Sequence, residues 1–73
     1  MKLYVLNRKE DISGVSGIGI LAEVVEFTDG HCVVRWIKER TLANVASTVF
    51  YDNKDDLLRV HGHNGATILE EVL

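Results

Sequence analysis

Short stretches of apolar residues alternate with polar ones along the chain, and the most regular of these patterns predicts a β-hairpin. Apolar, largely β-branched residues run from Ile20 to Phe27 and again from Cys32 to Ile37. Between them, Thr28 to His31 contains an Asp-Gly dipeptide. This dipeptide is typical of a two-residue type I′ turn between antiparallel strands. We therefore expect two strands joined at Asp29-Gly30.

A two-residue turn also predicts the register, because a slip of one residue would move every side chain of a strand to the other face. The expected register places Val25 opposite Val34, and Val24 opposite Arg35. The face expected to form the core carries Leu21, Val25, Phe27, Val34 and Trp36. The other face carries Ala22, Val24, Val33 and Ile37, with Glu26 and Arg35. Since both faces are largely apolar, the second needs a cover, which favours a homo-oligomer.

Weaker alternation predicts further strands on both sides of the hairpin. Residues 2–7 are expected to form a short strand at an edge of the sheet, and residues 46–51 another strand. Residues 66–73 predict a last strand, with a short helix as the alternative. Residues 11–19 hold three glycines and two serines. They follow neither period and predict a loop.

A helix of about two turns is expected before the last strand. Asp52-Asn53 offers an N-cap, and Asp55 and Asp56 place negative charge in the first turn. Gly62, in a left-handed conformation, is expected to end the helix after His61. The whole chain, residues 1–73, is thus predicted to be one mainly β (α+β) domain. Its expected architecture is a small twisted antiparallel sheet, or partly open barrel, of about five strands with one short helix between the last two strands.

Composition narrows the classes of function. The chain has 73 residues, of which 47% are hydrophobic, and its formal net charge is −3. An acidic balance argues against a broad phosphate-backbone footprint, so no nucleic-acid partner is expected. No apolar run approaches the roughly 20 residues of a membrane span. Cys32 is the single cysteine and cannot pair within the chain, so a reducing, cytoplasmic location is expected.

The glycine-rich loop is the first candidate binding site. The candidate residues are Ser13, Gly14, Ser16, Gly17 and Gly19. Successive backbone N–H groups and two hydroxyls in such a loop can hold an anion. The loop lacks the context of nucleotide fingerprints, because it precedes a strand and no lysine follows its glycines. The alternative role of the glycines is to form turns or bulges at a corner of the sheet.

His61, His63 and Arg35 complete the candidate site. His61 or His63 is expected either to hydrogen-bond a ligand or to lie at the C-terminal end of the helix, where a partial positive charge suits the helix dipole. No metal is expected, because zinc needs three or four ligands. Arg35 is expected to lie partly buried among Val24, Val33 and Ile37 and to pair with Glu26; if it faces the loop or the histidines, it is suited to a phosphate or carboxylate. No catalytic constellation can be argued from the spacing, so we expect no enzyme and no cofactor.

Several segments resemble one known family. They are Asp11–Gly19, Val25–Gly30, Arg35-Trp36, Ser47–Asp52 and His61–His63. In order and spacing they resemble a family of short uncharacterised proteins encoded by bacteriophages and by bacterial genomes with mobile elements. The resemblance spans residues 11 to about 67.

This resemblance implies a setting for the function. A small phage accessory protein in the host cytoplasm is expected to act by binding, without turnover. We expect it to counter a host defence by sequestering a nucleotide-like or anionic ligand between the glycine-rich loop, Arg35 and the His61–His63 turn. One alternative is a protein-interaction module that inhibits a host enzyme by direct binding. Another is a structural or regulatory phage protein without a ligand.

Overall fold

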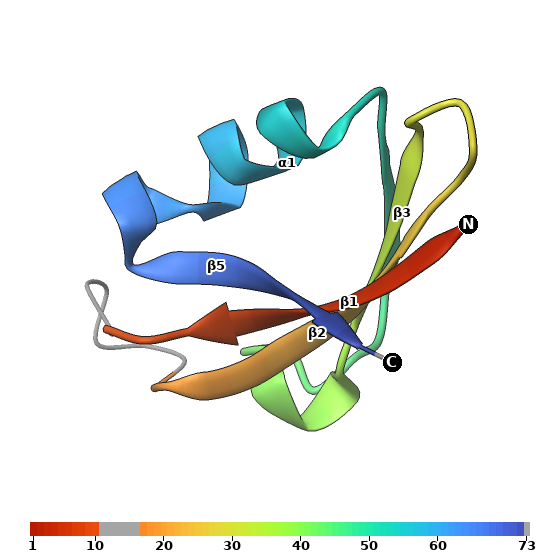
Figure 1. The fold of residues 1–73 in the computed structure, drawn as a ribbon. Helices are drawn as coiled ribbons and strands as arrows, with labels where there is room; N and C mark the ends of the chain where they lie inside the picture. Colours follow the sequence, from red (N-terminus) through yellow and green to blue (C-terminus); the bar gives the residue numbers. More distant parts are fainter. Residues whose placement is uncertain (11–16, 73) are drawn as a thin grey trace.

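A computed structural model describes residues 1–10 and 17–72 of the chain. As predicted, five antiparallel strands form one open sheet, and one helix lies between the last two strands (Figure 1). The strands are β1 (Lys2–Arg8), β2 (Gly19–Glu26), β3 (Cys32–Trp36), β4 (Thr48–Tyr51) and β5 (Thr67–Val72). The helix is α1 (Lys54–His61), and two short 3-10 turns are η1 (Lys38–Arg40) and η2 (His63–Gly65).

β1 is an interior strand of the sheet, between β2 and the edge strand β5. The strand order is β4-β3-β2-β1-β5, so the prediction that β1 is an edge strand is wrong. β5 returns antiparallel beside β1, where Leu69 lies opposite Leu6. Tyr4 and Leu6 are buried as a result. Local alternation could not reveal this position, because it depends on a pairing with the far end of the chain.

The β2–β3 hairpin forms as predicted, but its register is shifted by one residue. Phe27 N donates a hydrogen bond to His31 O at 2.8 Å, and Gly30 N donates to Phe27 O at 3.0 Å. The loop between Phe27 and His31 therefore has three residues. Gly30 has a φ of 95°, as expected for the left-handed residue that follows a type I turn in a three-residue loop. An Asp-Gly dipeptide suits this loop as well as a type I′ turn.

This shift changes which residues of the two strands share a face. We call the face of the sheet that α1 covers the inner face, and the opposite one the outer face. The core on the inner face consists of Tyr4, Leu6, Ala22, Val24, Cys32 and Val34 with Leu57 of α1. Val25 and Phe27, predicted for the core, lie outside it, whereas Ala22 and Val24, predicted for the second face, lie inside it. The predicted second face of Ala22, Val24, Val33 and Ile37 is therefore wrong.

α1 begins at the predicted cap, where Asn53 Oδ1 accepts a hydrogen bond from Asp56 N at 2.8 Å. The helix also ends at Gly62, but the predicted left-handed conformation of this glycine is wrong, because its φ is −75°. The left-handed residues come next, at positions 63–65. Gly62 is needed for another reason: a Cβ there would overlap the carbonyl oxygen of Leu58.

Candidate functional site

A buried arginine lies at the end of β1. Tyr4, Leu6 and Arg8 alternate along the strand and share the inner face. Arg8 is 8% exposed, and its Nε donates a hydrogen bond to Thr67 Oγ1 at 3.2 Å. In residues 1–10 and 17–72, no carboxylate lies within 4.0 Å of its guanidinium. A buried cation without a carboxylate partner is unusual, because burying a charge is unfavourable unless it is paired.

Thr67 orients this guanidinium. It lies opposite Arg8 in the β1–β5 register and is 1% exposed. Its backbone N donates to Gly62 O at 3.0 Å, which ties the strand to the end of α1. No fully buried side-chain nitrogen in the described residues lacks a hydrogen-bond partner. The two Nη groups of Arg8 therefore retain contact with solvent, from which a ligand can reach them.

Three aromatic rings from β3, β4 and α1 meet one another on the inner face. Tyr51 Oη and His61 Nε2 form a hydrogen bond of 2.7 Å. The His61 ring meets Trp36 edge-on, with centroids 4.9 Å apart. Burial lowers the pKa of His61, and the positive charges of His63 and Arg8 lower it further. His61 is therefore neutral near pH 7, and it lies within electrostatic range of Arg8. We call these residues the Arg8 cluster: Arg8, Trp36, Tyr51, His61 and Thr67.

A second arginine occupies the space that the glycines leave. Gly19 lies opposite Arg8 in the β1–β2 register. A Cβ on Gly19 would lie 3.4 Å from Arg40 Nη1, and one on Gly17 would lie 3.8 Å from Arg40 Nη2. Arg40 also donates a hydrogen bond to the carbonyl of Ile18. The described glycines of the predicted loop thus admit a guanidinium next to the end of β1.

Arg35, a predicted site residue, lies away from the histidines. It is on the outer face, exposed, and its Nη1 donates to Thr48 Oγ1 at 2.9 Å. Trp36, the next residue, contacts His61 on the inner face. The prediction of a partly buried Arg35 paired with Glu26 is wrong, because the shifted register turns the two side chains to opposite faces.

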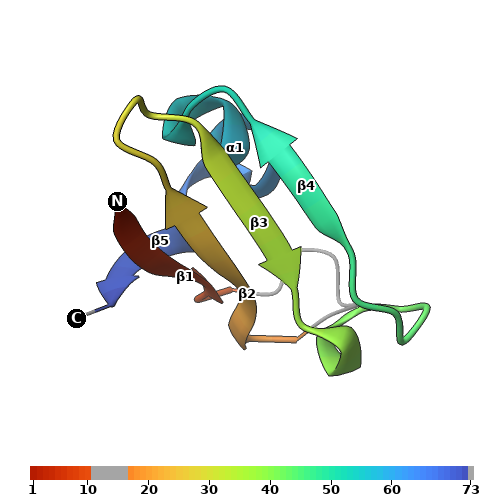
Figure 2. The ribbon, with the colours of Figure 1, turned by 90° about the vertical axis from the view of Figure 1, so that its right-hand side faces the viewer.

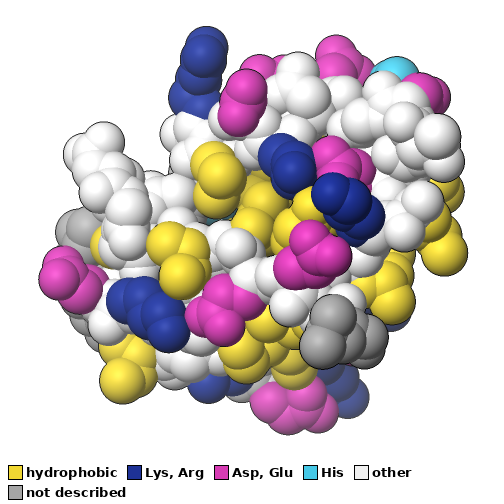
Figure 3. All heavy atoms as spheres, in the orientation of Figure 1, with side chains coloured by type: hydrophobic (Ala, Val, Ile, Leu, Met, Phe, Trp, Pro, Cys, Tyr) yellow, Lys and Arg dark blue, Asp and Glu magenta, His cyan; other side chains and the backbone are white. Residues whose placement is uncertain are grey.

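The other predicted residues divide between two places. His61 belongs to the Arg8 cluster, whereas His63 is exposed and lies beside a groove of about 630 Å³ between α1 and β5. Figure 3 shows this hollow, with hydrophobic side chains around it. The groove is lined by Leu58, Arg59, Val60, Gly62, His63, Asn64, Gly65, Thr67, Ile68 and Leu69. The predicted residues Ser13, Gly14 and Ser16 lie outside the described residues.

The sequence interpretation did not include Arg8, Arg40, Tyr51 or Thr67 in the site. A signal for Arg8 was present, because the alternation of Tyr4 and Leu6 continues to this residue. The predicted strand ended at Asn7, so Arg8 was not assigned to the inner face. Thr67 and Arg40 carry no comparable local signal, since each reaches the site through a distant part of the chain.

No three or more His, Cys, Asp or Glu side chains in residues 1–10 and 17–72 lie where they could hold a metal ion together. The helices in this part of the chain lack the length and apolar character that a membrane span requires.

Comparison with known proteins identifies one match. The sequence profile of a family described as "Acb5 phage protein" matches residues 1–72. No curated protein and no solved structure matches the chain.

Proposed function

The chain belongs to the Acb5 phage protein family, and from this premise we propose that it counters a host defence by sequestering an anionic, nucleotide-like ligand. It is a small phage accessory protein. Sequestration needs affinity and no turnover, which suits a chain of 73 residues. The proposed site is the Arg8 cluster, with Arg40 beside it.

Arg8 carries this proposal. Arg8 as a residue is only 8% exposed, and a buried cation loses hydration, which costs several kcal/mol unless an anion compensates. Thr67 supplies only a neutral acceptor for Nε. The Nη groups remain for a ligand, and their planar fork matches a phosphate or carboxylate with two parallel hydrogen bonds. A bound anion would supply the charge that the described residues do not.

The aromatic rings favour a nucleotide over a simple anion. Trp36 and Tyr51 are half-buried and lie around His61. Rings of this kind stack on nucleobases, with about 1–3 kcal/mol per base. A neutral imidazole also offers a donor or an acceptor to a base edge. Phosphate at Arg8 and a base among the rings would use both halves of the cluster.

Calorimetric titration tests the proposal. The wild-type chain is titrated with cyclic dinucleotides, ADP-ribose and inorganic phosphate. We expect Arg8→Gln to weaken the binding of the best ligand about tenfold to a hundredfold, the effect of losing a charge-assisted hydrogen bond. The matched control is Arg35→Gln on the outer face, which should bind as the wild type does.

Two results would contradict it. One is the absence of binding heat for all these ligands, with an unchanged melting temperature of the wild-type chain. The other is a loss of binding in Arg35→Gln with full binding in Arg8→Gln, which would move the site to the outer face.

A second candidate function is inhibition of a host enzyme by direct binding. It is supported by the groove between α1 and β5, whose lining includes Leu58, Ile68 and Leu69. β5 is an edge strand, and an edge beside a groove with apolar side chains can accept an extended peptide. Ile68→Lys should then abolish a stoichiometric complex with one host enzyme while leaving nucleotide titration unchanged.

A further inference from the structure

A row of apolar side chains crosses the outer face from one edge of the sheet to the other. Each member lies opposite the next in the strand registers. In Figure 2, α1 lies behind β3 and β4, so the outer face of these strands is turned toward the viewer. From β5 to β4 the row is Val72, Leu3, Val25, Val33 and Phe50.

The apolar side chains of this row are more exposed than is usual for a sheet face that contacts only solvent. Phe50 is 75% exposed, Leu3 45% and Val72 43%. Single exposed apolar residues are ordinary, but a contiguous band across a sheet is typical of an interaction surface. An antiparallel sheet with a solvated face normally carries polar residues there.

The neighbouring row on the outer face carries charge of both signs. Glu23 and Arg35 lie opposite each other on β2 and β3, in the middle of this row. Within residues 1–10 and 17–72, neither side chain forms an ion pair. Val5 and Thr48 flank the two charges.

We propose that the outer face binds a second copy of this chain, with a two-fold axis that runs parallel to the strands between β2 and β3. A rotation about this axis lays β2 of one copy over β3 of the other. Val25 then packs on the partner subunit's Val33, and Leu3 on the partner subunit's Phe50. Glu23 meets the partner subunit's Arg35. Each contact occurs twice, as an isologous interface requires.

Charge selects a second copy as the occupant. An acid and a base related by this axis make the face complementary to itself, whereas a face of one sign would repel its copy. Two twisted sheets stack face to face at about 10 Å with their apolar rows interdigitated. The result is a β-sandwich with one α1 on each outside, and both Arg8 clusters remain accessible.

Sedimentation equilibrium over micromolar to millimolar concentrations tests the interface. We expect the wild-type chain to be dimeric and Val33→Glu to weaken its dimerisation at least about a hundredfold, because it buries charges in the apolar row. Val60→Glu is the matched control, since Val60 is an exposed valine on α1, and its dimerisation should equal that of the wild type. Circular dichroism shows that each variant remains folded.

A charge exchange tests the pairing itself. Glu23→Arg and Arg35→Glu should each weaken dimerisation about tenfold or more, because like charges then meet across the axis. The double variant Glu23→Arg/Arg35→Glu should recover wild-type dimerisation. A wild-type monomer at all concentrations would overturn the proposal, and so would a dimer that Val33→Glu and both single exchanges leave intact. Nucleotide titration of these variants reports on Arg8 separately, so failure of one proposal leaves the other testable.

Discussion

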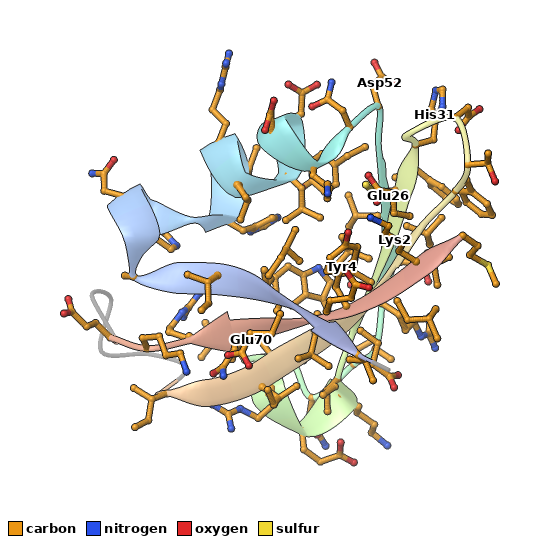
Figure 4. All side chains as sticks on the ribbon, viewed as in Figure 1. Lys2, Tyr4, Glu26, His31, Asp52 and Glu70 are labelled. Atoms are coloured by element: carbon orange, nitrogen blue, oxygen red, sulfur yellow. The ribbon has the colours of Figure 1, made fainter. Side chains whose placement is uncertain are left out.

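Two charged clusters on the inner face of the same sheet differ in how their charges are balanced. Near the start of β1, Tyr4 Oη donates to Glu26 Oε1 at 3.1 Å, and Lys54 Nζ lies 3.5 Å from Glu26 Oε2 and donates to Tyr4 Oη at 3.2 Å. Figure 4 shows Tyr4 and Glu26 close to each other, to the right of α1. At the other end of β1, the Arg8 side chain donates a hydrogen bond to the Thr67 hydroxyl and forms no ion pair with any described residue.

The comparison separates a structural ion pair from the proposed binding site. The Tyr4–Glu26–Lys54 cluster closes on itself, so its acid and base compensate each other within the fold. The Arg8 cluster leaves a cation to be compensated from outside. Residues that evolution selects for function often lower the stability of the fold, because they are not selected for folding. Removal of the charge should therefore lower the free energy of unfolding at the Tyr4–Glu26–Lys54 cluster, and should leave it constant or raise it at the Arg8 cluster.

The largest effect is expected for Glu26→Ala. It leaves Lys54 and Tyr4 without their shared acceptor, and loss of such a charged hydrogen-bond partner costs about 2 kcal/mol of unfolding free energy. Urea unfolding measures it. Glu10→Ala, at an exposed position, is the control and should stay within about 0.5 kcal/mol of the wild type. An equally small effect of Glu26→Ala would mean that the closed cluster does not stabilise the fold.

A smaller effect of opposite sign is expected for Arg8→Met. Methionine fills similar space without a buried charge, so the unfolding free energy of the ligand-free chain should stay constant or rise by about 1 kcal/mol. The control is Lys38→Met on the exposed η1 turn, which should change little. A loss as large as that of Glu26→Ala would show that Arg8 is structural and would remove the contrast.

The smallest effect concerns the pH dependence that His61 contributes. The pKa of His61 is lowered in the folded state, first by burial and then by the charges of His63 and Arg8. Below about pH 6.5 the unfolded chain takes up a proton that the folded chain resists, so stability falls as the pH drops through this range. NMR titration of the His61 ring should show that Arg8→Met raises its pKa, and that a bound anion raises it in the wild type. An unchanged pKa in both cases would mean that Arg8 and His61 do not act together.

Much of the fold could be predicted from local pattern. The hairpin, the helix cap at Asn53 and the strand after Gly62 follow from turn residues and alternation, which act over a few neighbours. The register could not, because Asp29-Gly30 suits loops of two and of three residues. Core packing favours the three-residue loop, because the register that this loop gives brings Val24 and Val34 together in the core.

The site was less predictable than the fold. Alternation indicates that Arg8 faces inward only if β1 is continued by one residue. His61 was identified from the His-Gly-His sequence, but its contacts with Trp36 and Tyr51 depend on how α1 crosses the sheet. Arg35 was assigned to the site through a register that is one residue off. Residues that meet through distant pairings leave little trace in a local pattern.

The pairing of β1 with β5 has a consequence for biosynthesis. Arg8 and Thr67 are separated by 59 positions, so their contact cannot exist until the ribosome has passed β5. Pairings between distant parts of a chain are also slow to form, because the entropy of loop closure is lost before the stabilising contacts are made. The nascent chain thus has neither a completed sheet nor the complete proposed ligand site, and any binding capacity should arise in one step, late and together with the folded state.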